Sequence, residues 1–404
     1  MNIQTTQRAD YTFKYNRTSG RHGWLRLTPA YSVKLVEEIL RDSVTKGIIL
    51  DPFSGSGTTG LCAKEQGQEA YLFEINPFLV WLAKAKCRSY SEIAAAEILA
   101  AAKSALSIDV SEHDFEQYTP NMYQIERWWT KSAITALSKI RAGISLTFGA
   151  PGQSDVGDLL WVAFCRLVID TSSAAFNHVS MSFKEMPTQQ SILEIDDIYL
   201  SAVGFVASTL LLPSETPVHV LEQDSLQIRP IDFKASHVIT SPPYPNRISY
   251  IRELRPYMYW TGFLQDSQAA SELDWSAVGG TWGVATSRLA SWEPSLQIPV
   301  SCLSKTVDTI ERSDGRSSHL MAQYVHKYFH DMFLHLSSLK SVLEDNAKID
   351  YILGNSYFFG VHVPTDMIIT DMLHTIGYKN EKSTVIRKRN SKKGLFEFRI
   401  EART

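Results

Sequence analysis

Residues 48–60, with the sequence IILDPFSGSGTTG, combine an apolar strand, an acidic residue at its end and a glycine turn that opens a helix. Gly55 and Gly57 let the backbone approach a ligand closely, and the free amides at the following helix start favour a polar or anionic group. The Lys-Ser/Thr pair of a phosphate-binding loop is missing, and Asp51 would repel a pyrophosphate while attracting an amino group. The stretch therefore predicts the first strand and cofactor loop of an α/β domain.

A second predicted strand, residues 69–74, ends in an acid. Glu74 stands 23 residues after Asp51. In a Rossmann-like unit, the acid at this point accepts hydrogen bonds from both ribose hydroxyls of a nucleoside cofactor. A solvated acid at a strand end is the alternative interpretation.

Residues 240–244, with the sequence TSPPY, directly follow an apolar strand. Two consecutive prolines neither continue a helix nor donate to a sheet ladder, so the backbone must leave the strand here. Ser241 offers a hydroxyl, Pro242 a carbonyl, and Tyr244, after Pro243, a flat face for stacking. Together these groups could hold an amino group on a planar ring, although a Pro-Pro turn with an aromatic end also occurs in ordinary loops.

With these two stretches the chain resembles the S-adenosylmethionine-dependent amino-methyltransferases of DNA, whose hallmarks are a loop like DPFSGSG (51–57) and a tetrapeptide like SPPY (241–244). The resemblance covers roughly residues 11–90, 216–260 and 320–404. It implies a Rossmann-like α/β methyltransferase fold whose mixed sheet ends in a C-terminal hairpin. It also implies S-adenosylmethionine as cofactor and double-stranded DNA as partner. The cofactor loop precedes the tetrapeptide, unlike the permuted order of many Ser-Pro-Pro-Tyr relatives.

The resemblance and the residue patterns together predict the site. In the family, a segment like the one around Phe13 closes over the methionine end of the cofactor. Asp224 would accept from the cofactor's adenine amino group, although an Asp here is also a common turn former. The predicted cofactor-binding residues are Phe13, Asp51, Pro52, Phe53, Ser54, Gly55, Gly57, Thr58, Glu74 and Asp224, and the predicted catalytic residues are Ser241, Pro242, Pro243 and Tyr244.

Two segments without a family counterpart interrupt the predicted catalytic domain. The first shows apolar residues at helical spacing, and the second is rich in Ser, Thr, Gly and Trp without sustained periodicity, as expected of an irregular, target-recognising insertion. The predicted DNA-binding residues are Arg247, Arg252, Trp282 and Arg288. The expected division is catalytic 1–106, helical insertion 107–213, catalytic 214–265, irregular insertion 266–316 and catalytic 317–404.

Composition limits the class of protein. With 404 residues and 44% hydrophobic content, the chain can bury a full core, while a net charge of -3 leaves phosphate contacts to local basic patches. Four widely spaced cysteines argue against a disulfide framework and a zinc site, and no apolar run is long enough to cross a membrane. His326 and His330 share a helix face but lack a third ligand, so no metal is predicted. We expect a soluble cytoplasmic protein, associated with a bacterial or archaeal nucleoid.

The identity of residue 241 bears on the substrate base. Adenine-modifying relatives usually carry Asp or Asn there, whereas a short serine hydroxyl suits the more compact cytosine, so transfer to N4 of cytosine is the favoured prediction. The alternatives are N6 of adenine, an RNA or protein methyltransferase using the same amino-group chemistry, and a catalytically silent DNA-binding subunit. A carbon-5 cytosine methylase would need a cysteine behind a proline, which none of the four is. A cognate restriction endonuclease acting on the same site is a further possible partner.

Overall fold

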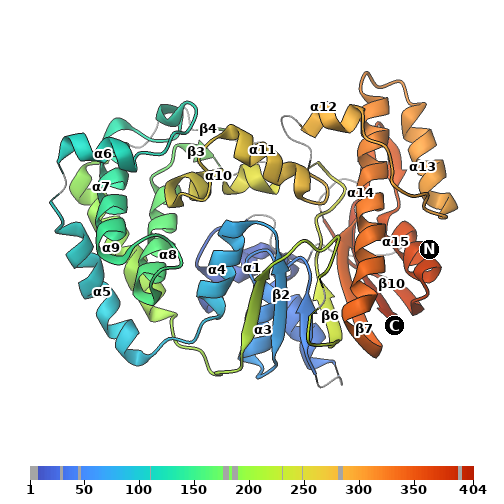
Figure 1. The fold of residues 1–404 in the computed structure, drawn as a ribbon, viewed down its shortest axis with the longest axis horizontal. Helices are drawn as coiled ribbons and strands as arrows, with labels where there is room; N and C mark the ends of the chain where they lie inside the picture. The colour runs from blue at the N-terminus through green and yellow to red at the C-terminus, as the bar shows by residue number, and fades with distance from the viewer. Residues whose placement is uncertain are drawn as a thin grey trace.

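A twisted seven-stranded sheet lies at the centre of the molecule, with the strand order β10-β11-β7-β6-β1-β2-β5 (Figure 1). The computed structural model describes residues 8–27, 31–43, 47–109, 111–175, 182–183, 190–229, 231–247, 249–280, 285–389 and 394–404. The strands of the sheet are β1 (Ile49–Asp51), β2 (Ala70–Glu74), β5 (Val218–Glu222), β6 (Ala235–Thr240), β7 (Leu343–Gly354), β10 (Lys379–Lys388) and β11 (Phe396–Arg403).

The pairing is parallel except at the C-terminal hairpin. β1, β2, β5, β6 and β7 are parallel, whereas β11 runs antiparallel to both β7 and β10. The chain builds outward from β1 through β2 to β5 and then returns to β6 on the other side of β1. Ligands of such sheets bind at this switch point, outside the carboxyl ends of the strands. The predicted Rossmann-like methyltransferase fold with its terminal hairpin is confirmed.

Side chains alternate between two buried faces of the sheet. Leu50, Val238 and Tyr351 belong to a core built with α14 (Ser318–Leu339) and α15 (Thr365–Ile376), whereas their neighbours Ile49, Ile239 and Ile352 pack with α2 (Val33–Arg41) and α3 (Thr58–Glu65). Successive strand residues point to opposite faces, so fully buried strands require helices on both sides.

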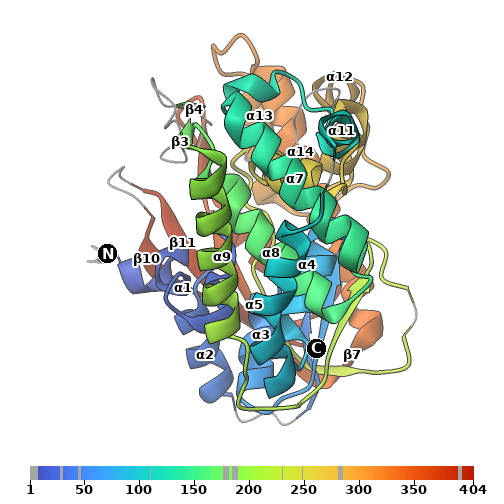
Figure 2. The same ribbon diagram turned by 90° about the vertical axis from the view of Figure 1, so that its left-hand side faces the viewer.

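A helical bundle lies beside the β5 end of the sheet (Figures 1 and 2). It contains α5 (Glu92–Leu106), α6 (Glu112–Tyr118), α7 (Lys131–Phe148), α8 (Asp155–Asp170) and α9 (Ile192–Ser208). It joins the catalytic part through α4 (Pro77–Cys87) and α10 (Tyr250–Thr261), whose buried Trp260 meets Trp129 and Phe164 edge to face. The segment predicted to be a helical insertion is therefore helical.

The bundle begins earlier than the expected boundary at residue 106. α4 ends at Cys87 and α5 begins at Glu92, because the chain turns between them and the side chain of Ser91 accepts from Ala94 N to cap the second helix. α5 then packs against α7, α8 and α9.

The segment 266–316, predicted to be irregular, is instead mostly helical. It forms α11 (Ser267–Ser276), α12 (Ala285–Ala290) and α13 (Ser301–Glu311). Its helices are short and separated by loops, so their periodicity is hard to read, yet Leu289, Leu303 and Ile310 are buried in one core with residues of α14. Tertiary burial thus stabilises helices that local propensity alone would leave marginal.

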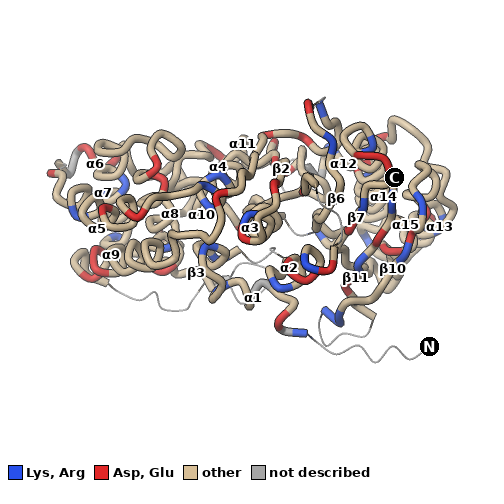
Figure 3. Tube along the Cα trace, turned by 90° about the horizontal axis from the view of Figure 1, so that it is seen from below, with Lys and Arg blue, Asp and Glu red and all other residues tan. Residues whose placement is uncertain are grey.

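Short helices and strands complete the described part of the chain. They are η1 (Ala9–Tyr11), α1 (Phe13–Asn16), η2 (Gly20–Gly23), η3 (Ile125–Arg127), β3 (Ala174–Ala175), β4 (Ser182–Phe183), η4 (Lys340–Val342), β8 (Ser356–Phe358) and β9 (Val361–Val363). Figure 3 shows Lys and Arg interleaved with Asp and Glu along the trace. No helix among the described residues is both long and apolar enough to span a membrane.

Candidate active site

A cavity opens at the carboxyl ends of β1, β2 and β6, where the strand order reverses. Most predicted cofactor residues reach its wall, together with two residues of the tetrapeptide. The predicted residues that line it are Pro52, Phe53, Ser54, Gly55, Thr58, Glu74, Asp224, Ser241 and Pro243. The two stretches singled out by their sequence therefore share one cavity.

The cofactor loop has the shape that its glycines predict. Gly55 and Gly57 have φ angles of 51° and 80°, in the left-handed region that favours glycine. A Cβ atom on Gly57 would lie 3.0 Å from the Cβ of Ala83, so this glycine also allows α3 to pack closely on α4. The loop closes through a bond from Gly57 N to the Ser54 carbonyl at 2.8 Å, and α3 begins directly behind it.

Asp51 is enclosed beneath the loop instead of lining the cavity. Its carboxylate is fully buried and accepts from Thr240 Oγ1 at 2.6 Å, Thr59 Oγ1 at 2.5 Å and Phe53 N at 3.1 Å. Burial raises the pKa of Asp51 to about 6. The hydrogen bonds act in the opposite direction and lower the pKa, but burial has the larger effect. Because Thr240 precedes the tetrapeptide, Asp51 ties the cofactor loop directly to it.

Glu74 combines contacts to the loop with access to the cavity. Its carboxylate accepts from Gly55 N at 2.9 Å, Ile75 N at 3.0 Å and Asn76 N at 2.9 Å. Burial raises its pKa to about 7, although the side chain is only half-buried and borders the cavity. Each carboxylate oxygen has lone pairs beyond those used by the backbone, so Glu74 can still accept from ribose hydroxyls.

Two buried polar atoms in the cavity wall have no hydrogen-bond partner within the described chain. They are Oγ of Ser54 and Nε2 of Gln223, on residues that are 3% and 7% exposed. Buried polar groups are normally paired, so unpaired groups facing a cavity point to a polar ligand. Asp224, next to Gln223, is exposed and accepts from Leu226 N at 2.8 Å, so it forms the expected turn while also bordering the cavity. The cavity therefore fits a nucleoside cofactor.

Residues of β7 and α14 fix the tetrapeptide. Ser241 Oγ donates to the carbonyl of Ile352 at 3.0 Å, and Tyr328 OH donates to the carbonyl of Pro243 at 2.8 Å. Among the described residues no hydrogen bond occupies the carbonyl of Pro242. The serine oxygen and the Pro242 carbonyl thus keep lone pairs for a substrate amine.

Tyr244 is anchored by the C-terminal hairpin. Its hydroxyl donates to Glu397 Oε1 at 2.7 Å, and Arg387 holds the same carboxylate with contacts of 2.7 and 3.1 Å. The guanidinium of Arg389 lies 5.3 Å from the centre of the Tyr244 ring. Gly354 lies close beside the ring, since a Cβ there would be 2.8 Å from Tyr244 Cδ2. Neither Tyr244 nor Pro242 borders the cofactor cavity.

The predicted DNA-binding residues fall in different places. Arg247 is exposed just after the tetrapeptide, with φ of 58°, and its backbone N–H donates to Tyr324 OH at 3.1 Å. Arg252 lies on α10, whereas Arg288 on α12 pairs with Glu272 through two contacts of 2.8 and 2.5 Å. Trp282 lies outside the described residues, and Phe13 lies in α1, with its side chain outside the description.

Several functional candidates carried no clear sequence signal. Tyr31, Asn76, Gln223, Tyr250 and Val278 line the cavity. Gln223 could have been suspected because it precedes Asp224 at a strand end, but Val278 reaches the wall only through the packing of α11. Among the described residues the group of three potential metal ligands is His22, Cys62 and Glu65, which does not include His326 and His330.

The fold is the Rossmann-like one found in methyltransferases, and the cavity fits a nucleoside cofactor. A family model described as DNA methylase matches residues 7–85. The chain is also similar to the Type II methyltransferase M.BsoBI of Geobacillus stearothermophilus, with 22% identity over 96% of this chain and 84% of that protein. It is similar as well to the Type II methyltransferase M.AvaI of Nostoc sp., with 22% identity over 95% of this chain and 84% of that protein.

A solved structure, the rRNA methyltransferase aviRa from Streptomyces viridochromogenes, matches with a TM-score of 0.30 and 12% identity, covering 93% of this chain and 86% of that one. This likeness is too weak to carry an argument. The family match and the Type II relatives confirm the resemblance read from the two motifs. They support an S-adenosylmethionine-dependent DNA amino-methyltransferase, with S-adenosylmethionine as the implied cofactor.

Proposed function

We propose that this enzyme methylates the N4 amino group of cytosine in duplex DNA. The observation that carries the proposal is the bond from Ser241 Oγ to the Ile352 carbonyl at 3.0 Å, in a residue that borders the cofactor cavity. With its hydrogen donated to the Ile352 carbonyl, the serine oxygen can accept from a group in the cavity. An acceptor at that point suits an amine hydrogen.

The chain's acceptors would activate the amine. Its lone pair is delocalised into the base, and hydrogen bonds from its two hydrogens to Ser241 Oγ and the Pro242 carbonyl would favour a tetrahedral, nucleophilic nitrogen. When bound, S-adenosylmethionine supplies an electrophilic methyl group on a sulfonium. Ser241 Oγ and the Pro242 carbonyl would hold the amine that accepts this methyl group, and the methylated nitrogen would lose one proton to solvent.

The cofactor would lie along the cavity wall with its ribose at Glu74. The Glu74 carboxylate would accept hydrogen bonds from the ribose hydroxyls, and the unpaired groups of Ser54 and Gln223 would supply further polar contacts. Asp224 would accept from the adenine amino group. Asp51 would act indirectly, by holding the loop and Thr240 in register.

The target base must leave the helix to reach these acceptors, because its amino group is paired in a duplex. Tyr244 would stack on the extruded base, and the exposed Arg247 beside it would contact the strand backbone. We assign base reading to the segment 266–316 and to the helical bundle, because the catalytic core offers few groups that could reach base edges. Trp282, Arg252 and Arg288 are the proposed contacts in and beside these segments.

Cytosine is favoured over adenine by the short side chain at position 241. N6 of adenine is the second candidate, and an RNA base is the third. Similarity to Type II methyltransferases supports a role in a restriction-modification system, with a cognate endonuclease that cuts the same site. A DNA substrate would also place the enzyme at the nucleoid.

The test is mass spectrometry of nucleosides after incubating unmethylated duplex DNA with the enzyme and labelled S-adenosylmethionine. Label in N4-methylcytosine is expected. Label in N6-methyladenine would contradict the base assignment, and label appearing only in RNA would contradict the substrate class. Ser241→Ala serves as the inactive control.

A further inference from the structure

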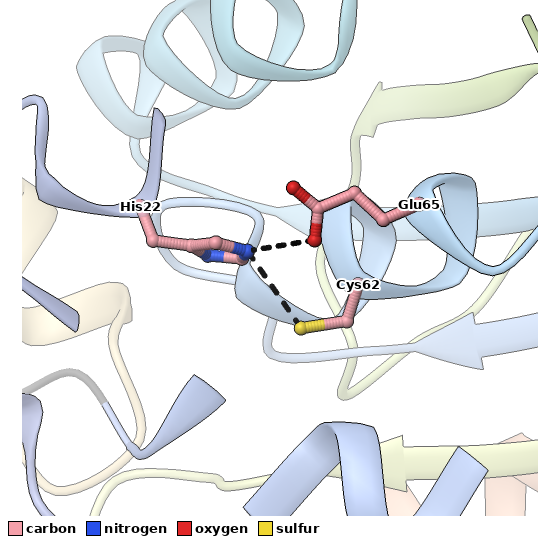
Figure 4. Close-up of side chains that lie close together, drawn as sticks. All are labelled: His22, Cys62 and Glu65. Atoms are coloured by element: carbon pink, nitrogen blue, oxygen red, sulfur yellow. Dashed lines mark hydrogen bonds and ion pairs between the residues drawn. The ribbon is translucent and has the colours of Figure 1, made fainter. Parts of the chain in front are cut away.

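Three potential metal ligands face one another outside the cofactor cavity. Figure 4 shows His22, from η2, pointing toward Cys62 and Glu65, which lie one turn apart on α3. His22 Nε2 is 3.5 Å from Glu65 Oε2 and 3.8 Å from Cys62 Sγ. The three ligand atoms all lie within 4.8 Å of one another, and no second such group occurs in the described ranges of the chain.

The separation of 3.5 Å between His22 Nε2 and Glu65 Oε2 suits a shared ion better than a hydrogen bond. A good side-chain hydrogen bond from nitrogen to oxygen measures about 2.7–3.2 Å. Ligands about 2.0–2.3 Å from a tetrahedral zinc ion stand about 3.3–3.7 Å apart. His22 and Cys62 are 7% and 0% exposed, so water has little access to their ligand atoms. Buried polar side chains normally have well-formed hydrogen bonds, so the long contacts of His22 and Cys62 indicate a missing ion or other ligand.

The surrounding structure holds the ligands in place. Arg21, next to His22, is 1% exposed and donates to the carbonyls of Lys86 at 2.7 Å and Arg88 at 2.5 Å, which fixes η2 against the end of α4. Cys62 and Glu65 are three residues apart on one helix and therefore share a face. The Glu65 side chain is 28% exposed, so it opens a route for an ion and for water.

The charges around the cluster are compatible with a divalent cation. Burial raises the pKa of the Cys62 thiol well above its ordinary value, so the thiol is protonated until a metal displaces the proton. A competing charge is Lys86, whose ammonium donates to Ser56 Oγ at 3.4 Å, on the cofactor loop. A thiolate and a carboxylate together balance the two charges of the ion.

We propose that His22, Cys62 and Glu65 bind Zn²⁺ through imidazole nitrogen, thiolate sulfur and carboxylate oxygen, with water as fourth ligand. Binding releases the thiol proton of Cys62 to solvent. The ion cross-links η2 to α3 and so fixes the N-terminal segment that supplies Leu27 and Tyr31 to the cavity wall. The site takes no part in methyl transfer and does not depend on the proposed function.

Co²⁺ is the probe, because a cobalt–thiolate bond gives a near-ultraviolet charge-transfer band. Chelator-treated wild-type enzyme is titrated with Co²⁺ and then with Zn²⁺. We expect a band that saturates at one ion per chain and is lost when Zn²⁺ is added. Cys62→Ser should abolish the band and weaken Zn²⁺ binding by about 100-fold or more. The matched control is Cys87→Ser, a 4% exposed cysteine on the neighbouring α4, which should behave as wild type.

Glu65→Gln is included in case Cys62→Ser does not fold, because position 65 is partly exposed. This variant should bind Zn²⁺ more weakly and should still show the thiolate band at high Co²⁺ concentration. Absence of a band in the wild type overturns the proposal. So does a band that survives in Cys62→Ser, or an affinity that is unchanged in Glu65→Gln.

Discussion

The hydroxyl of Tyr244 donates to the carboxylate of Glu397 at 2.7 Å, across 153 residues of sequence. Glu397 is itself held by Arg387, its cross-strand neighbour in the C-terminal hairpin. The hairpin that ends the sheet therefore sets the orientation of the ring at the active-site tetrapeptide. Strongly paired, charge-assisted hydrogen bonds of this kind give geometric control as well as stability.

Glu397 is thus expected to act as a positioning residue for Tyr244. Tyr244→Phe keeps the ring and removes the bond to Glu397, and Glu397→Gln removes the charge that Arg387 holds. Each change should lower kcat/KM for DNA about 10-fold, because the stacking ring loses its fixed orientation, while the Kd for S-adenosylmethionine is unchanged. The control is Glu401→Gln, on the same strand but paired with Arg399. Steady-state kinetics with unmethylated DNA measure the effect, and equal loss in the control would contradict the assignment.

The sequence predicted those parts of the site that depend on neighbours along the chain. The strand, glycine turn and helix around Gly55 follow from local backbone requirements, and Glu74 follows from its strand end. The seven-stranded sheet with its terminal hairpin could be anticipated because buried strands and their order leave few arrangements.

Long-range partners could not be predicted in this way. Glu397 meets Tyr244 only because β11 pairs with β7 in one register, where Glu397 stands opposite Gly354. The burial of Asp51 beneath the loop, and the helices of segment 266–316, likewise arise from tertiary packing. The same holds for His22, which reaches Cys62 across 40 residues of sequence.

The ionisation of Glu74 should control cofactor affinity. Burial raises its pKa to about 7, and only the carboxylate can accept from both ribose hydroxyls. Affinity for S-adenosylmethionine should therefore be greatest above pH 7 and should weaken as the pH falls through about 7 and Glu74 becomes protonated. Calorimetric titration between pH 6 and pH 8, at roughly one unit either side of that value, measures the dependence. Glu74→Gln should bind more weakly and lose the dependence; a pH profile shared by wild type and variant would point to another group.

Gly57 should be essential for the fold of the cofactor loop. Gly57→Ala places a Cβ at a φ of 80° and 3.0 Å from the Cβ of Ala83. Left-handed strain and crowding should together lower the free energy of unfolding by about 1–3 kcal/mol. Gly204→Ala, in α9 with open space around the position, is the control and should be neutral or stabilising. Chemical denaturation compares them, and equal stabilities would show that the loop can relax.

Arg247 should contribute more to DNA binding than Arg288. Arg247 is exposed directly behind the tetrapeptide, whereas the charge of Arg288 is balanced by Glu272. Arg247→Ala should weaken DNA binding and reduce the slope of log K against log salt concentration by about one. Arg288→Ala should have a smaller effect on that slope. Fluorescence anisotropy at several salt concentrations measures both, and a larger change in Arg288→Ala would mean that Arg288 leaves Glu272 for a phosphate.

Ser241 should be required for transfer and dispensable for cofactor binding. Its hydroxyl donates to the Ile352 carbonyl, and in the proposed mechanism its oxygen accepts from the substrate amine, an interaction that would strengthen as the nitrogen becomes tetrahedral. Ser241→Ala should therefore lower kcat by about 100-fold or more and leave the Kd for S-adenosylmethionine unchanged. Ser276→Ala is the matched control, because Ser276 borders the same cavity but its hydroxyl donates to Leu273 at 2.8 Å within α11. Single-turnover transfer of labelled methyl groups separates chemistry from product release. If Ser241→Ala and Ser276→Ala transferred equally well, the acceptor for the amine would have to be sought elsewhere, with the Pro242 carbonyl as the first candidate.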